Sequence, residues 1–319
     1  MQTVLVAGGA GFIGSHLCKA LAEDYNIICV DNLITGDKKN IEELLSNHNF
    51  QFIEEDITKL NSEFRIQNSK LDYIFHLASP ASPNAKSPRS YINYPIETLL
   101  VNSVGTYNLL ELAQKTKARF LYASSSEVYG DPSISPQRED YFGNVNPNGP
   151  RSVYDEAKRF GEAMVMAYVR KFNLDARIVR IFNTYGPSMQ KDDGRVISNF
   201  INQALEGRQI TIYGDGSQTR SFCYIDDMVL GLKKAIFKEG LKGEVVNLGN
   251  PSEKTIKETA LMVKDMLKSA SEIVYHELPE DDPKRRNPDI EKAKRLLDWE
   301  PQVSFDKGLA ETISYFKSL

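Results

Sequence analysis

Cysteine is scarce in this sequence of 319 residues, which contains only Cys18, Cys29 and Cys223. An odd number of cysteines without close spacing is not typical of a disulfide framework or a zinc site, and it indicates a reducing compartment. Histidine is scarce as well, and the four histidines are scattered without a metal-ligand pattern. We therefore predict neither disulfides nor a bound metal.

Long apolar runs and an excess of basic charge are also missing. No stretch approaches the ~20 apolar residues that a membrane helix needs, and the formal net charge of -4 does not indicate a nucleic-acid or membrane surface binder. The first expected strand begins at residue 3, which leaves no room for a targeting segment, so we expect a cytoplasmic protein. The composition, with 41% hydrophobic and 26% charged residues, is that of an ordinary globular chain, and its length allows two lobes.

The N-terminal segment carries the pattern of a dinucleotide site. An apolar strand over 3–7 is followed by Gly8, Gly11 and Gly14 and then by helical spacing, which is the context that a dinucleotide fingerprint requires. A second strand ends at Asp31, where a carboxylate would hold an adenosine ribose hydroxyl and repel a ribose phosphate. We therefore predict NAD rather than NADP; the alternative is that the glycines only form turns. Further cofactor contacts are predicted from residues in or after the adjoining elements: Phe12, Ile13, Asn32, Asp56, Ile57, Leu77, Ala78, Ser79 and Asn102.

Tyr154 and Lys158 stand four residues apart, so on a helix they share one face. A tyrosine normally loses its proton near pH ~10, and a neighbouring ammonium group is expected to bring that pKa toward neutrality. Such a pair can take a proton from a sugar or alcohol hydroxyl, and a hydride must leave the same carbon. The alternative is an exposed helix pair without a catalytic role, which the glycine pattern upstream argues against.

Strand and helix signals alternate in the first half of the chain, as in a parallel sheet that is covered by helices on both faces. We therefore predict an α/β fold, with a Rossmann-type doubly wound parallel sheet and a smaller C-terminal substrate lobe. The NAD-binding domain is expected to span 1–181, with 219–250 returning to it, and the substrate-binding lobe to combine 182–218 with 251–319. Strands are predicted over 3–7, 26–31, 50–54, 72–77, 119–123 and 176–181, and helices over 12–23, 38–46, 97–116, 153–172, 196–206, 226–238, 255–268 and 290–297.

Three longer runs are the most specific motifs of the chain: Ser79-Pro80-Ala81-Ser82-Pro83, Ser126-Glu127-Val128-Tyr129-Gly130-Asp131-Pro132 and Asp281-Asp282-Pro283. With these motifs the chain resembles the extended short-chain dehydrogenase/reductases that act on nucleotide sugars, and within them the UDP-glucuronate decarboxylases. The resemblance runs from the glycine loop to the final helix. In the related 4,6-dehydratases an aspartic acid stands at the place of Ser126, and simple C4-epimerases usually lack a glutamate that matches Glu127, so this pair favours decarboxylation.

The resemblance implies that UDP-glucuronate is oxidised at C4 with tightly bound NAD, that the resulting 4-keto acid loses carbon dioxide, and that re-reduction gives UDP-xylose. Tyr154 would deprotonate the C4 hydroxyl, and Lys158 would lower the pKa of Tyr154 and hold the nicotinamide ribose. Ser125 would bond to the same sugar oxygen, and Glu127 would orient the sugar or assist proton movement at C5. The residues implied to hold the UDP-sugar are Asn183, Arg195, Tyr213, Arg220 and Arg286, of which Arg286 would lie near the sugar carboxylate.

Other functions stay open at this point. They are a UDP-sugar C4-epimerase such as a UDP-glucuronate 4-epimerase, a UDP-sugar 4,6-dehydratase, and a non-catalytic NAD-binding sensor, although such sensors typically lose the tyrosine or the lysine. The segment 84–94 is longer than the matching decarboxylase loop and is expected to border the sugar, which leaves the exact sugar open. Relatives dimerise through two helices that match 97–116 and 153–172, so the resemblance also implies a homodimer.

Overall fold

The computed structural model describes residues 1–60 and 70–319. Within these residues the centre of the molecule is a seven-stranded parallel sheet with the order β11-β6-β5-β4-β1-β2-β3. The order reverses between β1 and β4, where open α/β sheets bind ligands at the carboxyl ends of the strands. The predicted fold class is confirmed. The strands are β1 (Thr3–Ala7), β2 (Asn26–Asp31), β3 (Phe50–Glu54), β4 (Tyr73–His76), β5 (Arg119–Ser125), β6 (Ala176–Ile181) and β11 (Val245–Leu248).

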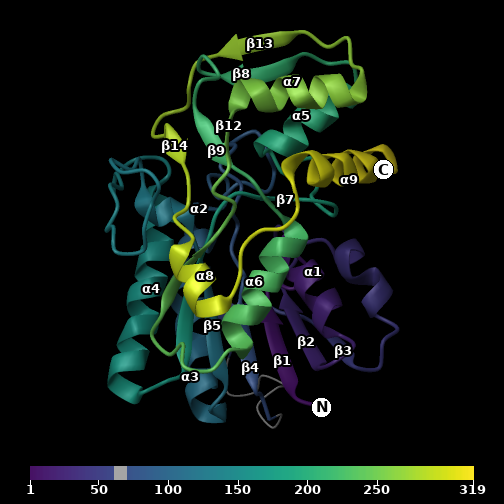
Figure 1. Cartoon of the computed structure of the whole chain (residues 1–319). Helices are drawn as coiled ribbons and strands as arrows, with labels where there is room; N and C mark the ends of the chain where they lie inside the picture. The colour runs from purple at the N-terminus through teal and green to yellow at the C-terminus, as the bar shows by residue number, and fades with distance from the viewer. Residues whose placement is uncertain (61–69) are drawn as a thin grey trace.

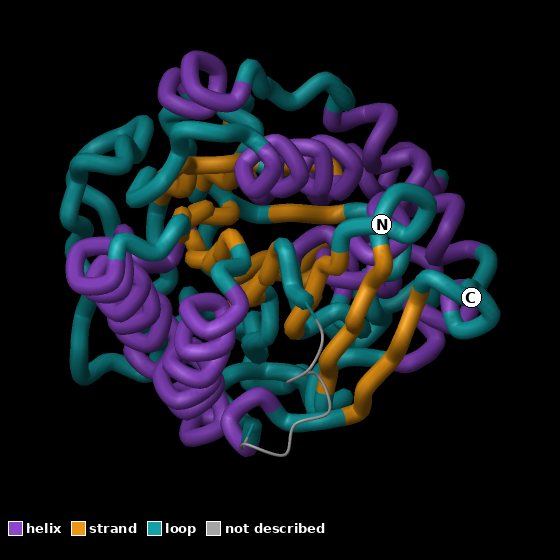
Figure 2. Tube along the Cα trace, turned by 90° about the horizontal axis from the view of Figure 1, so that it is seen from below, coloured by secondary structure: helices purple, strands orange, loops and turns teal. Residues whose placement is uncertain are grey.

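Helices cover both faces of this sheet (Figures 1 and 2). The helices α1 (Phe12–Leu21) and α6 (Ile225–Phe237) pack together on one face, and α3 (Thr106–Thr116) and α4 (Ser152–Phe172) pack together on the other. This three-layer arrangement follows from the apolar strands, because a parallel sheet with both faces buried needs a layer of helices on each side.

Strand β1 shows how the sequence divides between the two faces. Val4 and Val6 belong to the core on the α1 and α6 side, whereas Leu5 and Ala7 belong to the core on the α3 and α4 side. Successive side chains of a strand point to opposite faces, so a continuous apolar run is buried on both sides. Because β1 is fixed by packing on both faces, the glycine turn that follows it is also fixed, at the carboxyl edge of the sheet next to the crevice.

The smaller lobe lies beyond the carboxyl ends of the sheet strands, at the top of Figure 1. It is built from three helices and several short strand pairs, of which β8 and β13 run parallel and β9 lies between β12 and β14. β7 pairs with β10, and α8 packs against β11 and α6. The elements of the lobe and of the segments that connect it to the sheet are β7 (Thr184–Tyr185), α5 (Val196–Leu205), β8 (Ile210–Tyr213), β9 (Thr219–Ser221), β10 (Cys223–Tyr224), β12 (Glu253–Thr255), α7 (Ile256–Leu267), β13 (Ile273–His276), β14 (Arg285–Arg286), α8 (Glu291–Leu297) and α9 (Phe305–Lys317).

Two predicted helices differ from the structure. The helix expected over 38–46 is a 3₁₀ helix, η1 (Lys38–Leu44), because so short a segment gains little from the longer α-helical bonds. The helix expected over 97–116 begins at Pro95, which suits a first helical position, and continues as α2 (Pro95–Leu100), the π-helical turn η3 (Val101–Gly105) and α3. Helix α9 and the 3₁₀ turns η2 (Ile57–Lys59) and η4 (Ser126–Tyr129) were not predicted.

Candidate active site

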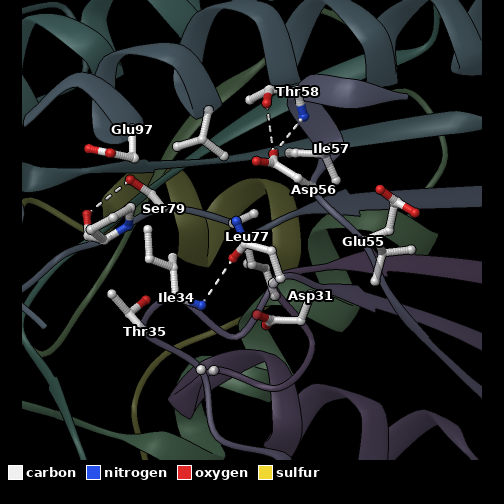
Figure 3. Close-up of a pocket in the computed structure, with 18 of the residues that line it drawn as sticks. Asp31, Ile34, Thr35, Glu55, Asp56, Ile57, Thr58, Leu77, Ser79 and Glu97 are labelled. Atoms are coloured by element: carbon white, nitrogen blue, oxygen red, sulfur yellow. Dashed lines mark hydrogen bonds between the residues drawn. The ribbon is translucent and has the colours of Figure 1, made fainter. Parts of the chain in front are cut away.

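Two adjoining cavities lie at the carboxyl ends of the sheet strands. The first has a volume of about 290 Å³ and is bordered by the ends of β1, β2 and β4 (Figure 3). The second has a volume of about 520 Å³ and extends from the glycine turn to the smaller lobe. Gly8, Gly11, Leu77 and Ser79 line both cavities, so a long ligand can extend from one into the other.

The glycine turn brings backbone to the wall of both cavities. Gly8 has a φ of +82°, and a Cβ atom at this position would lie 2.6 Å from the backbone nitrogen of Ala78. A Cβ atom at Gly14 would overlap the carbonyl oxygen of Gly8, so only glycine allows the turn and α1 to pack this closely. Gly11 stands directly before α1, whose first-turn amides and positive dipole end suit a pyrophosphate. The turn therefore fits a dinucleotide.

Two carboxylates lie at the strand ends in the first cavity (Figure 3). Asp31 at the end of β2 is 9% exposed and accepts hydrogen bonds from the backbone nitrogens of Ala10 (3.0 Å) and Leu33 (2.9 Å). Burial raises the pKa of Asp31, whereas these hydrogen bonds act in the opposite direction. Asp56 after β3 accepts bonds from the backbone nitrogen (2.9 Å) and hydroxyl (2.8 Å) of Thr58. Asp31 is thus fixed where it can accept bonds from ribose hydroxyls, which fits NAD.

The Tyr154 and Lys158 side chains project from α4 into the second cavity. The Lys158 ammonium group lies 5.6 Å from the centre of the Tyr154 ring and donates a hydrogen bond to the carbonyl of Ala123 (2.9 Å). Burial raises the pKa of Tyr154 to about 12, while a hydrogen bond with Ser125 acts in the opposite direction. Burial also lowers the pKa of Lys158 to about 7. The expected shift of the Tyr154 pKa toward neutrality is therefore wrong for this structure, because loss of solvent outweighs the hydrogen bond with Ser125.

A cluster of three arginines and two carboxylates, which we call the arginine cluster, borders the second cavity next to Tyr154. Glu127 Oε2 accepts from Arg151 Nη2 (2.6 Å) and Arg286 Nη2 (2.9 Å). Asp282 pairs with Arg151 (3.4 Å) and Arg220 (2.8 Å). Burial alone would raise the pKa of Glu127, but the charges of Arg286 and Arg151 hold it well below its usual range. Glu127 is therefore ionised at neutral pH and can accept a proton or hydrogen bond but not donate one.

The smaller lobe supplies the far wall of the second cavity, which includes four of the residues predicted to hold the nucleotide sugar: Asn183, Arg195, Tyr213 and Arg220. Arg220 lies on β9 and is 7% exposed. Its planar guanidinium group can bond to two oxygens at once, as diphosphate recognition requires. The cavity thus has a hydride-transfer side on the sheet and an anion-binding side on the smaller lobe.

Comparison with known proteins agrees with this geometry. Residues 4–249 match the model of the NAD dependent epimerase/dehydratase family. The chain belongs to this family. UDP-glucuronic acid decarboxylase 1 of Xenopus tropicalis is 48% identical over 317 residues, which are 99% of this chain and 72% of the relative. UDP-glucuronic acid decarboxylase 6 of Arabidopsis thaliana is 48% identical over 309 residues, 96% of this chain and 86% of the relative.

A solved structure of the same family has the same fold. It is the UDP-glucuronic acid 4-epimerase from Bacillus cereus, in complex with UDP-glucuronic acid and NAD, which is 32% identical with a TM-score of 0.88 over 99% of both chains. NAD is therefore the cofactor of this epimerase/dehydratase chain, in agreement with the glycine turn and with Asp31.

Most of the predicted cofactor residues line a cavity in the epimerase/dehydratase fold, but Asn102 does not. Gly14, Phe12 and Ile13 line the second cavity, and Asn32, Asp56, Ile57 and Ala78 line the first. Asn102 is fully buried behind Ser79, donates to the Ser79 hydroxyl (2.9 Å) and accepts from the Tyr122 hydroxyl (2.9 Å). It can thus position Ser79 but does not reach the cavity wall in the described residues.

Arg286 also differs from the expectation that it faces the sugar. It is 1% exposed and, in the described part of the chain, lines neither cavity. Its guanidinium group donates to the carbonyl of Gly130 and to Glu127. These partners hold it behind Glu127, so in this structure it contacts the site through that carboxylate.

Two residues of the second cavity were missed by the sequence interpretation. Arg151 lies three residues before Tyr154, and this spacing on the start of α4 could have identified it. Tyr91 lies in the unusual segment 84–94, and its ring stacks on Tyr154 with 5.0 Å between centres and 12° between planes. The segment lines the cavity as expected. Among the described residues, no cluster of three histidine, cysteine or acidic side chains could hold a metal ion. No helix in the same residues is long and apolar enough to cross a membrane.

Proposed function

We propose that this chain is a UDP-glucuronate decarboxylase that produces UDP-xylose. The proposal rests on one observation: three features line or border the two adjoining cavities. They are the glycine turn with Asp31, the Tyr154/Lys158 pair, and the arginine cluster. The decarboxylase names of relatives at 48% identity over nearly the whole chain support it.

The residues of the first cavity and Lys158 would hold NAD, which when bound supplies an acceptor for the C4 hydride and a donor for its return. Tyr154 takes the proton of the C4 hydroxyl in its phenolate form, which the hydrogen bond with Ser125 favours. In its protonated form, Lys158 places a positive charge beside the ring, which stabilises that phenolate. Ser125 hydrogen-bonds to the same sugar oxygen as Tyr154 and so keeps the C4 hydroxyl oriented toward Tyr154.

Oxidation at C4 makes the sugar a β-keto acid, because the carboxylate carbon C6 is attached to C5. Carbon dioxide can then leave while its bonding electrons move into the C4 carbonyl, and the resulting enolate takes a proton from a water molecule at C5. Glu127 stays ionised between Arg151 and Arg286, so it can accept a bond from the sugar and orient the ring. The chain contributes mainly orientation and charge placement.

Ser126 argues against dehydration. It is 2% exposed and lines the cavity at the place where a dehydratase needs an acid to protonate a departing C6 hydroxyl, and a serine hydroxyl is not such an acid. The second candidate is a UDP-glucuronate 4-epimerase, which the similarity to the Bacillus cereus enzyme favours. It would use the same Tyr154 and Lys158 but release no carbon dioxide.

Three further properties are part of the proposal. The NAD-binding domain comprises 1–181 and 219–250, which the pairing of β11 with β6 supports, and the nucleotide-sugar lobe comprises 182–218 and 251–319. The protein works in the cytoplasm, which the buried free thiols of Cys18, Cys29 and Cys223 support. It also forms a homodimer, which the exposed apolar side chains of α2 to α4 support.

The deciding experiment is incubation with UDP-glucuronate and catalytic NAD, with the product followed by proton NMR and carbon dioxide measured in parallel. We expect UDP-xylose and one carbon dioxide per turnover. Tyr154→Phe should lower the rate by roughly two to four orders of magnitude, the usual contribution of a general base, and should leave nucleotide binding intact. A 4-epimer without carbon dioxide would favour the epimerase, and near-normal turnover of Tyr154→Phe would remove Tyr154 from the mechanism.

A further inference from the structure

The arginine cluster holds more positive than negative charge. Arg151, Arg220 and Arg286 share two carboxylates, Glu127 and Asp282, which leaves one positive charge in excess. The side chains of the three arginines are at most 11% exposed and those of the two acids at most 22%. An unbalanced charge that is held mostly away from water favours an anion in the adjoining cavity.

Asp155 does not restore the balance. It follows Tyr154 on α4, is 5% exposed, and its Oδ1 atom has no hydrogen-bond partner among the described residues. Burial and the charge of Glu127 raise the pKa of Asp155 to about 8, so it is mostly neutral at pH 7. The excess positive charge is therefore present under ordinary conditions.

The three arginines differ in what they present to the cavity. Arg286 lies behind Glu127 and does not reach the wall in the described residues. Arg220 reaches it from β9, on the side of the smaller lobe. Arg151 reaches it from the start of α4, three residues before Tyr154, so both side chains lie on the same face of one helix. Of these three arginines, Arg151 is therefore the one that shares a cavity wall and a helix face with Tyr154.

We propose that Arg151 selects a sugar that carries a carboxylate, by binding the C6 carboxylate while Tyr154 engages the C4 hydroxyl. This inference rests on the proposed function. C6 is only two bonds from C4, so a base at C4 and a cation on the same helix face match the two groups of one substrate. Arg286 is then a positioning residue, which holds Glu127 from behind, while Arg151 pairs with Glu127 and Asp282 and also faces the sugar.

Arg151 is shared with two carboxylates of the protein, and this also suits a sugar carboxylate that must leave as carbon dioxide. Its guanidinium group already serves Glu127 and Asp282, so the sugar carboxylate competes for part of its bonding capacity. A very tight ion pair would stabilise the ground state and oppose the departure of neutral carbon dioxide. A guanidinium group that is shared with Glu127 and Asp282 binds the sugar carboxylate less tightly. It therefore recognises the carboxylate while opposing the departure of carbon dioxide less strongly.

The test is a comparison of binding affinities for UDP-glucuronate and UDP-glucose, measured by calorimetry on the NAD-bound enzyme in the Tyr154→Phe background, which prevents turnover. Arg151→Gln should weaken UDP-glucuronate at least roughly tenfold and UDP-glucose by less than about threefold, since only the former loses a charge-assisted bond. Arg151→Lys, which keeps the charge without the planar fork, should reduce the preference by a smaller factor. This variant also keeps the test open if Arg151→Gln does not fold.

Two controls separate recognition from general damage. Arg138→Gln removes an exposed arginine that pairs with Asp140 outside both cavities, and it should leave the affinity ratio unchanged. Arg286→Gln should lower turnover in the otherwise unmodified enzyme while changing the ratio little. An unchanged affinity ratio in both Arg151 variants, or a loss of the preference for UDP-glucuronate only in Arg286→Gln, would overturn this inference and leave the proposed function standing. If the parent enzyme does not prefer UDP-glucuronate, the proposed function fails together with it.

Discussion

At the scale of single residues, Asp31 is the group that distinguishes the two nicotinamide cofactors. It is fixed by two backbone hydrogen bonds in the wall of the first cavity, where it can bond to ribose hydroxyls and repel a 2′-phosphate. We expect NAD to bind at least tenfold more tightly than NADP, a difference of about 1.4 kcal/mol. Calorimetry with both cofactors checks this, and Asp31→Asn should narrow the gap. Equal affinities in the unmodified protein would show that Asp31 does not contact the ribose.

Asp155 gives a prediction about stability and pH. Burial raises its pKa from an ordinary value near 3.8 to about 8 in the folded protein. A group with a raised folded-state pKa stabilises the fold fully below its unfolded pKa, and this contribution is lost as the pH rises through the folded pKa. Relative to Asp155→Asn, the unmodified protein should therefore lose stability between about pH 4 and pH 8, by at most roughly 1.4 kcal/mol per pH unit, and no further above pH 8.

The measurement is urea denaturation of both proteins at several pH values from 5 to 9. The difference in free energy of unfolding, and not either value alone, isolates Asp155, because other groups titrate equally in both proteins. A difference that stays constant with pH would show that Asp155 is ionised in the folded state.

Short-range sequence patterns were enough to identify several residues of the active-site cavities. Gly8, Gly11, Asp31 and the Tyr154/Lys158 pair line the cavities as the patterns predicted. The sequence could not show that Arg286 lies behind Glu127, because the two residues are 159 positions apart and only the fold decides which side of a carboxylate an arginine occupies. The pKa of Tyr154 also depends on burial, which spacing does not give.

At the scale of elements, the loop 82–93 connects the two sides of the active-site cavities. The hydroxyls of Ser82 and Ser87 donate to the carbonyls of Asp193 and Asp192 in the smaller lobe. Arg89 bonds to Asp192 (3.0 Å) and to the carbonyl of Thr35 (3.0 Å), which lies beside the first cavity. This loop overlaps the segment 84–94, and its contacts form a bridge across the ligand cavities.

Arg89→Met should weaken this bridge and speed the release of NAD. The variant loses two hydrogen bonds of a charged group, each typically worth about 1.5–3 kcal/mol, although exposure of Arg89 reduces that value, so we expect dissociation to accelerate roughly tenfold. NAD retained after gel filtration, and its rate of exchange with labelled NAD, are the quantities to measure. Arg208→Met, which removes an exposed arginine paired with Glu206, is the matched control. Equal exchange rates in both variants would mean that the bridge does not hold the cofactor.

The sheet and its helices were predictable, whereas much of the smaller lobe was not. The strands of the sheet are apolar runs bounded by turn residues, and the structure has all six predicted strands near their expected bounds. Strands such as β7, β10 and β14 contain only two residues, and their pairing partners lie far away in the chain. So short a segment has no periodicity to detect, because tertiary contacts alone make it a strand.

At the scale of the whole molecule, α2 to α4 carry an unusual set of exposed apolar side chains. The helices pack against one another on the outer side of the sheet, on the left in Figure 1. Ile96 is 60% exposed, Tyr107 47% and Phe160 49%, and Leu99, Leu100 and Val104 are exposed as well. Large apolar side chains gathered on adjacent helices are typical of an interface with another protein. Two copies related by a twofold axis would bury them in a four-helix contact.

The homodimer predicts a mass of about twice the 36.0 kDa of one chain. Ile96→Asp combined with Phe160→Glu should shift the protein to a monomer, because both copies would bring new charges to a contact that buries them on each side. Light scattering at micromolar concentration measures this directly. Leu261→Asp changes a side chain that is 48% exposed on α7, in the smaller lobe, and should leave the dimer intact. A monomeric parent protein, or equal masses for the double variant and the control, would remove this face as the dimer contact.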